Sequence, residues 1–221
     1  MKIAVIGATG NLGKRVAKRA LEAGYEVKAI VREKQKYDLD TELLEKDLFE
    51  LTVDDLKDVE VVFSAFGSGF SCDPVINQKA FEKYIELFEG SSKRLFVIAG
   101  AGCLYTEHTH QILEYEAPHA SKRLYGISSY TTKGVEELME HKEMNWTVIC
   151  PSRKFDAQGP YTGDCLIGEN REIIFNEDGE SYVTYEDIAQ EIVKLFSDEN
   201  NQYKNKVITM ATRKMPGKDM K

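Results

Sequence analysis

The sequence predicts an α/β fold built on a doubly wound parallel sheet, with strand order 3-2-1-4-5-6 and a small C-terminal hairpin-helix-strand extension. The first observation is that residues 2–32 read as strand, glycine turn, helix and strand. The second is that further apolar runs of strand length alternate with helical patterns along the chain, which is typical of helices covering both faces of a parallel sheet.

The first unit contains three glycines at intervals of three residues, directly after an apolar run. Gly7 allows a sharp turn out of the strand, Gly10 lets a phosphate approach the backbone, and Gly13 lets the helix lie close to the strand. The helix N-terminus adds free N–H groups and the positive end of its dipole. The pattern favours a dinucleotide site over a purely structural turn, with contacts from Gly7, Thr9, Gly10, Asn11, Leu12 and Gly13.

The second strand ends in Arg32, at the position where an acidic residue would bind the ribose hydroxyls of NAD. An arginine suits the 2′-phosphate of NADP instead, and Lys34 and Lys36 add positive charge nearby. We therefore expect NADP(H) rather than NAD(H). The alternative is a solvated run of charges in which Glu33 opposes the arginine.

Later strands are expected at 43–47, 59–65, 95–99 and 145–150, and small or polar residues follow each of them. Carboxyl ends of parallel strands meet at one edge of a sheet, where a cofactor binds. The residues expected to contact the cofactor there are Asp47, Leu48, Ala65, Phe66, Gly67, Gly100, Ala101, Gly102 and Pro151. Asp47 could equally be a plain loop aspartate.

Helices are expected from Asp73-Pro74 to about residue 89 and over 128–142. The turn signal at 176–179 predicts a hairpin between 173–175 and 182–183. A capped helix from Thr184 and a strand at 206–210 follow. We expect residues 1–211 to form one domain, in which 152–211 contribute the substrate-side loop and the extension, and 212–221 to be a loose tail.

Two long connections, 104–126 and 152–163, are expected to form the substrate side of the site, because long connections without periodicity are usually functional or disordered. Their aromatic side chains could form a slot for a planar molecule: Tyr105, Tyr115, Tyr125, Phe155 and Tyr161. Glu107, His108, His110, Glu114 and His119 could instead suggest a metal site. Their spacing matches no helical ligand pair, so we expect no metal.

Composition narrows the class of protein. The net charge of −8 argues against a nucleic-acid surface, and the apolar runs are far shorter than a membrane span. Four scattered cysteines and a strand at the very N-terminus predict a cytoplasmic protein with reduced thiols and no signal peptide. We expect a monomer or homodimer with a small-molecule acceptor as its partner, and neither nucleic acid nor membrane.

Several motifs together resemble a known family. They are G-A-T-G-N-L-G, A-I-V-R, the G-A-G after the fifth strand, N-W-T-V-I-C-P-S and D-G-E-S-Y-V-T-Y-E-D-I-A. The chain resembles the NAD(P)-binding atypical short-chain dehydrogenases with a Rossmann fold, close to NADH-flavin reductase-like and flavin/biliverdin reductase-like (NmrA-like) proteins. The resemblance runs from residue 1 to about 210. It implies the fold and the cofactor more specifically than the substrate.

In that family a tyrosine four residues before a lysine serves as the acid, and the lysine lowers the pKa of the tyrosine. Here Lys133 stands at the lysine position and is also expected to contact the cofactor, but Ser129 lies four residues earlier and Tyr130 three. Tyr130 and Lys133 are therefore the candidate catalytic pair, with exposed helix residues as the alternative. The incomplete pattern argues against ordinary alcohol dehydrogenation.

Reduction of a stacked planar acceptor depends on orientation more than on a strong acid. The sequence therefore favours an NAD(P)H-dependent reductase that passes hydride to a flavin, quinone or similar planar acceptor. A flavin would then be a substrate rather than a bound cofactor. Two alternatives stay open: an NADP-binding sensor without turnover, and an NAD(P)-dependent isomerase or epimerase.

Overall fold

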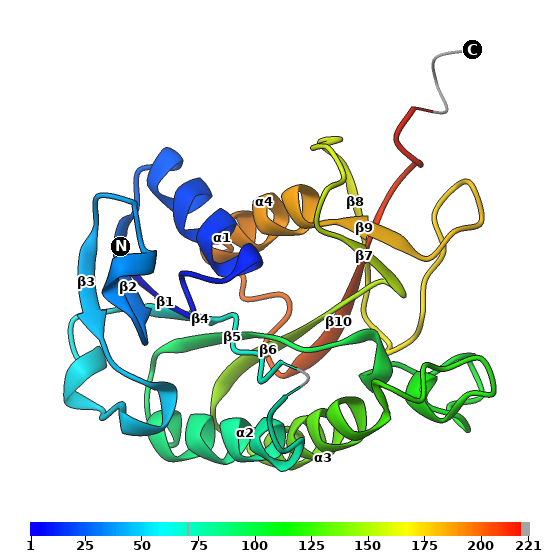
Figure 1. Cartoon of the computed structure of the whole chain (residues 1–221), viewed down its shortest axis with the longest axis horizontal. Helices are drawn as coiled ribbons and strands as arrows, with labels where there is room; N and C mark the ends of the chain where they lie inside the picture. Colours follow the sequence, from blue (N-terminus) through cyan, green and yellow to red (C-terminus); the bar gives the residue numbers. More distant parts are fainter. Residues whose placement is uncertain (70, 218–221) are drawn as a thin grey trace.

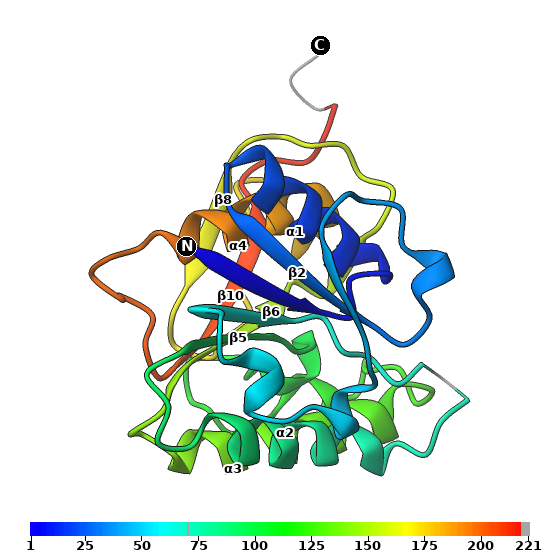
Figure 2. The same cartoon turned by 90° about the vertical axis from the view of Figure 1, so that its left-hand side faces the viewer.

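A central sheet lies between two layers of helices in the computed structural model, which describes residues 1–69 and 71–217. Figure 1 shows α1 (Asn11–Glu22) and α4 (Tyr185–Phe196) on one face of the sheet. On the other face are α2 (Val75–Phe88) and α3 (Tyr125–Glu140), and the turned view of Figure 2 shows the same arrangement. The predicted α/β class is confirmed.

The sheet begins with six parallel strands in the predicted order 3-2-1-4-5-6. They are β1 (Lys2–Ile6), β2 (Glu26–Val31), β3 (Glu42–Glu45), β4 (Val61–Ser64), β5 (Arg94–Ile98) and β6 (Asn145–Pro151). The order reverses between β1 and β4, and this switch point leaves a crevice at the carboxyl ends of the strands. The predicted doubly wound topology is confirmed.

Two more strands extend the sheet beyond β6. β10 (Lys206–Thr212) pairs parallel with β6, and β8 (Cys165–Gly168) pairs antiparallel with β10. A separate two-stranded sheet joins β7 (Lys154–Asp156) in parallel to β9 (Tyr182–Thr184). Short 3-10 turns complete the described elements: η1 (Lys34–Lys36), η2 (Leu48–Glu50), η3 (Asp54–Leu56), η4 (Ala101–Cys103) and η5 (Glu114–Glu116).

The C-terminal hairpin was predicted wrongly. Its turn exists: the Asn176 N–H donates to the carbonyl of Glu180 at 2.9 Å, and Asn176 Oδ1 accepts the N–H groups of Asp178 and Glu180. Residues 173–175 form no strand, however, and the residues after the turn enter β9, which pairs with β7. The asparagine side chain closes this loop locally, so the turn needs no paired strands on either side.

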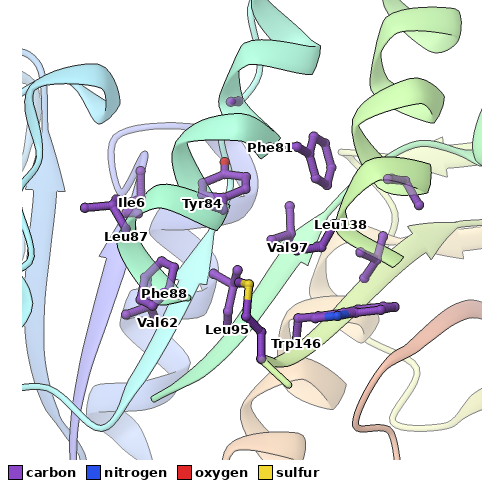
Figure 3. Close-up of a cluster of buried hydrophobic side chains, with 14 of the residues drawn as sticks. Ile6, Val62, Phe81, Tyr84, Leu87, Phe88, Leu95, Val97, Leu138 and Trp146 are labelled. Atoms are coloured by element: carbon purple, nitrogen blue, oxygen red, sulfur yellow. The ribbon is translucent and has the colours of Figure 1, made fainter. Parts of the chain in front are cut away.

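Side chains alternate across β1 and divide the core into two halves. Ala4 and Ile6 face α2 and α3, whereas Ile3 and Val5 face α1 and α4. Figure 3 shows the α2–α3 half, in which aromatic side chains of α2 meet the sheet and Trp146 closes one end. The predicted inner face of this helix, Ala80, Phe81, Tyr84, Ile85 and Phe88, is confirmed by its packing in this cluster.

The start of α4 agrees with the capped helix that the sequence predicts from Thr184. Thr184 Oγ1 accepts the N–H of Asp187 at 3.0 Å, which is the predicted N-cap. Glu186 then joins α4 to α1, because Arg15 Nε donates to it at 2.7 Å and Arg19 Nη2 at 3.2 Å.

We propose that residues 1–211 form one domain, because one sheet and its two half-cores span them. Of the predicted tail over 212–221, Thr212 ends β10 and the Met215 N–H donates to Asp178 Oδ2 at 2.7 Å. Residues 218–221 lie outside the described part of the chain.

Candidate functional site

The glycine turn between β1 and α1 is closely packed on both sides. Gly7 has a φ of +77°, and a Cβ there would lie 3.0 Å from the carbonyl oxygen of Ala65. A Cβ on Gly13 would lie 2.3 Å from the carbonyl oxygen of Gly7, which real side chains do not tolerate. The turn therefore requires glycine at both positions, as the phosphate-site pattern predicts.

The N-terminus of α1 suits an anion. Gly10 is the N-cap and provides no side-chain cap, and the first turn contains no acidic residue. The positive end of the dipole of this 12-residue helix is therefore not neutralised within its own first turn. Backbone N–H groups and small residues at a helix start fit the diphosphate of a dinucleotide.

A first pocket of about 130 Å³ lies beside this turn and brings together residues from the ends of four strands, β1 to β4. Nine of its lining residues were predicted as cofactor contacts: Gly7, Thr9, Gly10, Arg32, Asp47, Leu48, Ala65, Phe66 and Gly67. Three other predicted contacts, Asn11, Leu12 and Gly13, lie in the first turn of α1 and do not line it; Leu12 is buried in the core. Lys46 also lines the pocket and was missed, because a lysine before an aspartate carries no distinctive sequence signal.

The first pocket contains two basic side chains, Arg32 and Lys46, and one acidic side chain, Asp47. Arg32 is exposed, and its guanidinium makes no hydrogen bond or ion pair with the described residues, although it lies near Glu33. Lys46 Nζ donates to Asp55 Oδ2 at 2.7 Å. The Asp47 carboxylate has a structural role, since it accepts the N–H of Phe49 at 3.0 Å and caps η2.

A middle pocket of about 200 Å³ continues from the first one, and the two share Phe66 and Gly67. It runs beneath the carboxyl end of β5, where Gly100 and Gly102 line it as predicted. A Cβ on Gly102 would lie 2.8 Å from Ser128 Oγ, so this glycine lets the segment after β5 lie against α3. Sequence reasoning missed the polar lining of the middle pocket: Asn77, Tyr84, Ser128 and Thr131.

A third pocket of about 450 Å³ adjoins the middle one, and both are lined by Gly100 and Gly102. Ala101 and Pro151 line it as well, as the sequence predicts for the ends of β5 and β6. The three pockets thus form one continuous row along the carboxyl edge of the sheet, from the end of β2 to the end of β6.

Part of the predicted aromatic slot is present in the third pocket. Tyr115 and Phe155 line it, and Phe155 packs on Tyr185 with ring centroids 3.8 Å apart. The other three predicted aromatics do not line it. Tyr125 lies against Tyr115 and is exposed, Tyr105 stacks on His110, and Tyr161 lies under Arg19.

Three charged or ionisable side chains form a chain of contacts in the wall of the third pocket. Glu114 is buried, and Arg153 donates to both of its carboxylate oxygens at 2.8 Å. The Nε2 atom of His119 lies 2.8 Å from Glu114 Oε1. Arg153 was missed by sequence reasoning. The only available signal was its position two residues after Pro151, at the end of β6.

The two candidate catalytic residues, Tyr130 and Lys133, contact each other but do not line any of the three pockets. Lys133 Nζ lies 4.8 Å from the centre of the Tyr130 ring, and Lys133 is exposed. The α3 residues that line the middle pocket are instead Ile127, Ser128 and Thr131. A shift of one or two positions around the helix therefore places hydroxyl groups, rather than the phenol and ammonium, at the row of pockets.

The other histidines of the connection 104–126 lie in a separate cluster. His108 and His110 both pair with Glu172, and among the described residues there is no group of three or more histidine, cysteine, aspartate or glutamate side chains that could bind a metal. The four cysteines are free thiols. None of the helices in the described ranges is both long enough and apolar enough to cross a membrane.

Comparison with known proteins places this geometry in context. The sequence profile of the NAD(P)H-binding family matches residues 7–199. The uncharacterized protein YwnB of Bacillus subtilis (strain 168) is 32% identical over 213 residues, which cover 96% of this chain and 99% of YwnB.

Solved structures are similar over the same length. SP1627 of Streptococcus pneumoniae TIGR4, described as "a putative NADH-flavin reductase", has a TM-score of 0.89 and 31% identity, with 96% of this chain and 99% of that chain covered. A protein from Lactobacillus casei has a TM-score of 0.85 and 25% identity, with 97% of this chain and all of that chain covered.

Proposed function

The chain belongs to the NAD(P)H-binding family, and from this premise we propose that it is an NADPH-dependent reductase that passes hydride to a flavin, quinone or similar planar acceptor. The family resemblance inferred from the sequence motifs is confirmed by the family match and by the similarity to SP1627. The observation that carries the proposal is the continuous row of three pockets, with a glycine turn at one end and an aromatic-lined pocket at the other.

The first pocket and the start of α1 are the proposed site of the nucleotide half of the cofactor. Backbone N–H groups of Asn11, Leu12 and Gly13 would face the diphosphate, as expected for a helix N-terminus after a glycine turn. Arg32, which follows β2, and Lys46, which follows β3, supply positive charge beside Asp47. Because the Arg32 guanidinium has no partner among the described residues, it supports a preference for the 2′-phosphate of NADP(H) over NAD(H).

The middle and third pockets are the proposed site of the nicotinamide half and of the acceptor. When bound, the dihydronicotinamide ring supplies a hydride. Gly100, Ala101, Gly102 and Pro151 leave room beside the strand ends for a ring to lie flat. Tyr115 and Phe155 offer apolar faces against which a planar acceptor can stack and from which water is excluded.

The placement of α3 supports this chemistry over alcohol dehydrogenation. Tyr130 and Lys133 lie outside the linings of the middle and third pockets, so they do not reach the place where a carbonyl substrate would need its acid. Orientation beside the cofactor remains available for a flavin or quinone, whose reduction depends on stacking and exclusion of competing reactions. The name of SP1627 agrees with this substrate class. We also propose a cytoplasmic location, which the four free thiols support.

The test is oxidation of NADPH, followed by its absorbance, with riboflavin, FMN and menadione as acceptors. We expect acceptor-dependent oxidation that is faster with NADPH than with NADH. The matched control is Gly10→Val, which places a side chain between the first pocket and the helix start and should remove both binding and turnover. Tight NADPH binding by calorimetry without oxidation of any acceptor would contradict the reductase proposal and favour a nucleotide sensor.

A further inference from the structure

The third pocket contains a carboxylate that is held rigidly in its wall. Glu114 is 7% exposed and lies in η5. Arg153, from the segment between β6 and β7, donates through Nε to Oε1 and through Nη2 to Oε2, both at 2.8 Å. A paired fork of this kind fixes the plane of the carboxylate and leaves both of its oxygens as acceptors.

His119 completes this arrangement at the pocket mouth. Its Nε2 atom lies 2.8 Å from Glu114 Oε1, and because a carboxylate oxygen accepts, Nε2–H is the donor. The ring is thereby oriented with Nδ1 as its second, uncommitted nitrogen. The side chain is 54% exposed, so it can exchange protons with water. Of the four histidines, all within the described residues, His119 alone lines the third pocket.

The proposed reaction consumes one proton, which either water or a side chain of the pocket can supply to the acceptor. Transfer of a hydride adds two electrons and one hydrogen to the acceptor, and a quinone then carries negative charge on oxygen until it is protonated. Tyr115 also lines the pocket, but burial and the nearby Glu116 raise its pKa to about 12, so its phenol holds its proton firmly. The side chains from the N-cap and first turn of α3 that line the third pocket, Leu124, Ile127 and Ser128, are not charged.

We propose, on the basis of the reductase function above, that His119 is the proton donor to the acceptor and that Glu114 is its positioning residue. As hydride leaves the dihydronicotinamide for the acceptor, the Nδ1–H bond of the His119 imidazolium breaks and a new O–H or N–H bond forms on the acceptor. The neutral imidazole then takes a proton from water. NADPH is oxidised, the acceptor is reduced by two electrons, and one solvent proton is consumed.

The charges around His119 suit this role. Glu114 Oε1 lies 2.8 Å from His119 Nε2 on one side of the ring, and Arg153 lies on the far side of the same carboxylate. The arrangement resembles a carboxylate that orients a histidine and fixes its tautomer in acid–base catalysis. Because the proposal makes the protonated ring the active form, the rate should fall as the pH rises.

The first test compares His119→Asn with His110→Asn, using the full chain with NADPH and menadione. His110 lies on the same connection but pairs with Glu172 and does not line the pocket. We expect His119→Asn to lower kcat about 100-fold, at the lower end of what a general acid contributes. The KM for NADPH should stay unchanged, and the loss of rate at higher pH should disappear. His110→Asn should behave as the unmodified chain.

The second test does not depend on activity. Imidazole NMR of the protein without ligands should show His119 as the Nε2–H tautomer at neutral pH, and Glu114→Gln should convert it to a mixture of tautomers. NADP⁺ should bind equally well to the His119→Asn variant and to the unmodified chain.

The outcomes separate this inference from the proposed function. If the unmodified chain binds NADPH but none of the acceptors supports its oxidation, the reductase proposal fails and this inference fails with it. If the unmodified chain is active and His119→Asn keeps its kcat and pH profile, the inference alone is wrong. An Nδ1–H tautomer of His119 in the unmodified chain would likewise contradict it.

Discussion

Gly13, in the first turn of α1, lies directly against the carbonyl group of Gly7, so that a Cβ on Gly13 would come within 2.3 Å of that oxygen. The contact joins the end of β1 to the start of the helix, and it holds the turn in the shape that the proposed diphosphate site requires. A methyl group at this position must push the helix away from the strand.

Gly13→Ala is therefore expected to weaken both the fold and the cofactor site. Overpacking of this kind costs about 1–3 kcal/mol in the free energy of unfolding, which urea denaturation measures. The Kd for NADPH should rise in the same variant. The control is Gly179→Ala, since Gly179 has a φ of +79° with nothing near its Cβ position and lies in the 176–179 turn. It should lose stability through backbone strain but bind NADPH normally. Normal binding by Gly13→Ala would refute the assignment.

Arg32→Glu is expected to weaken NADPH binding more than NADH binding. The change removes a guanidinium from the first pocket and puts a negative charge beside the expected 2′-phosphate. Loss of one charge-assisted hydrogen bond, about 1.5–3 kcal/mol, corresponds to a rise of about 10- to 100-fold in the Kd for NADPH. Fluorescence titration with both nucleotides measures this difference. Lys34→Glu makes the same charge change outside the pocket and should affect both Kd values little. Equal losses for the two nucleotides in Arg32→Glu would show that the site does not select NADP.

Tyr130→Phe is expected to leave the reductase rate unchanged. Tyr130 contacts Lys133 on α3, and neither side chain lines the three pockets. Steady-state turnover of NADPH with menadione at several pH values measures this, with Lys133→Met as the companion variant. A drop of kcat comparable to that of His119→Asn would restore the tyrosine–lysine pair as the catalytic apparatus.

Phe155→Ala and Tyr161→Ala should differ in their effect on the acceptor. Phe155 lines the third pocket, whereas Tyr161 lies under Arg19 on the α1 side. We expect Phe155→Ala to raise the KM for FMN or menadione about 2- to 10-fold, since an aromatic pair is worth about 0.5–1.5 kcal/mol beyond area burial. Tyr161→Ala should leave that KM unchanged. Equal KM values in the two variants would place the acceptor elsewhere.

Acid should destabilise the chain through Asp55, apart from any effect on activity. Hydrogen bonds from Lys46 and Thr52 lower the pKa of this carboxyl from 3.8 to about 2. A lowered pKa in the folded state means that the contribution to stability is complete above about pH 4 and is lost as the pH falls toward 2.

Urea midpoints at pH 7 and at low pH measure this contribution. Asp55→Asn should lower the midpoint at pH 7 and reduce the difference between the two pH values. Asp54→Asn is the control, because Asp54 is exposed and its one ion pair with another described residue is with Lys57 at the surface. An unchanged pH dependence in Asp55→Asn would contradict the assignment.

The sequence was sufficient for those parts of the fold that repeat a local pattern. Apolar runs and glycine turns correctly predicted β1 to β6 and their order, because burial on both faces and backbone geometry leave residue-level signals. The hairpin was wrong because Asn176 satisfies the turn without strands, so the turn signal did not specify the pairing. β8 was missed because Cys165–Gly168 is too short to show periodicity.

The substrate side of the site was less predictable for a different physical reason. The pairing of Glu114 with Arg153 spans 39 residues and depends on how two irregular segments meet, which no spacing rule encodes. On α3, the helical period identified the correct helix but not its rotation. Tyr130 and Ser128 differ by two positions, and this difference decides which of them faces the pockets.

The position of β10 between β6 and β8 has a consequence for biosynthesis. While the chain emerges from the ribosome, β6 remains an open edge until residues 206–212 have been made, and β8 has no partner although it was synthesised earlier. The N-terminal glycine turn, β1 and α1 can form long before this. The nascent protein therefore exposes the unpaired edge of β6 until nearly all of the residues up to Thr212 have left the exit tunnel. A chaperone that covers β6 during this interval would protect the nascent chain from aggregation.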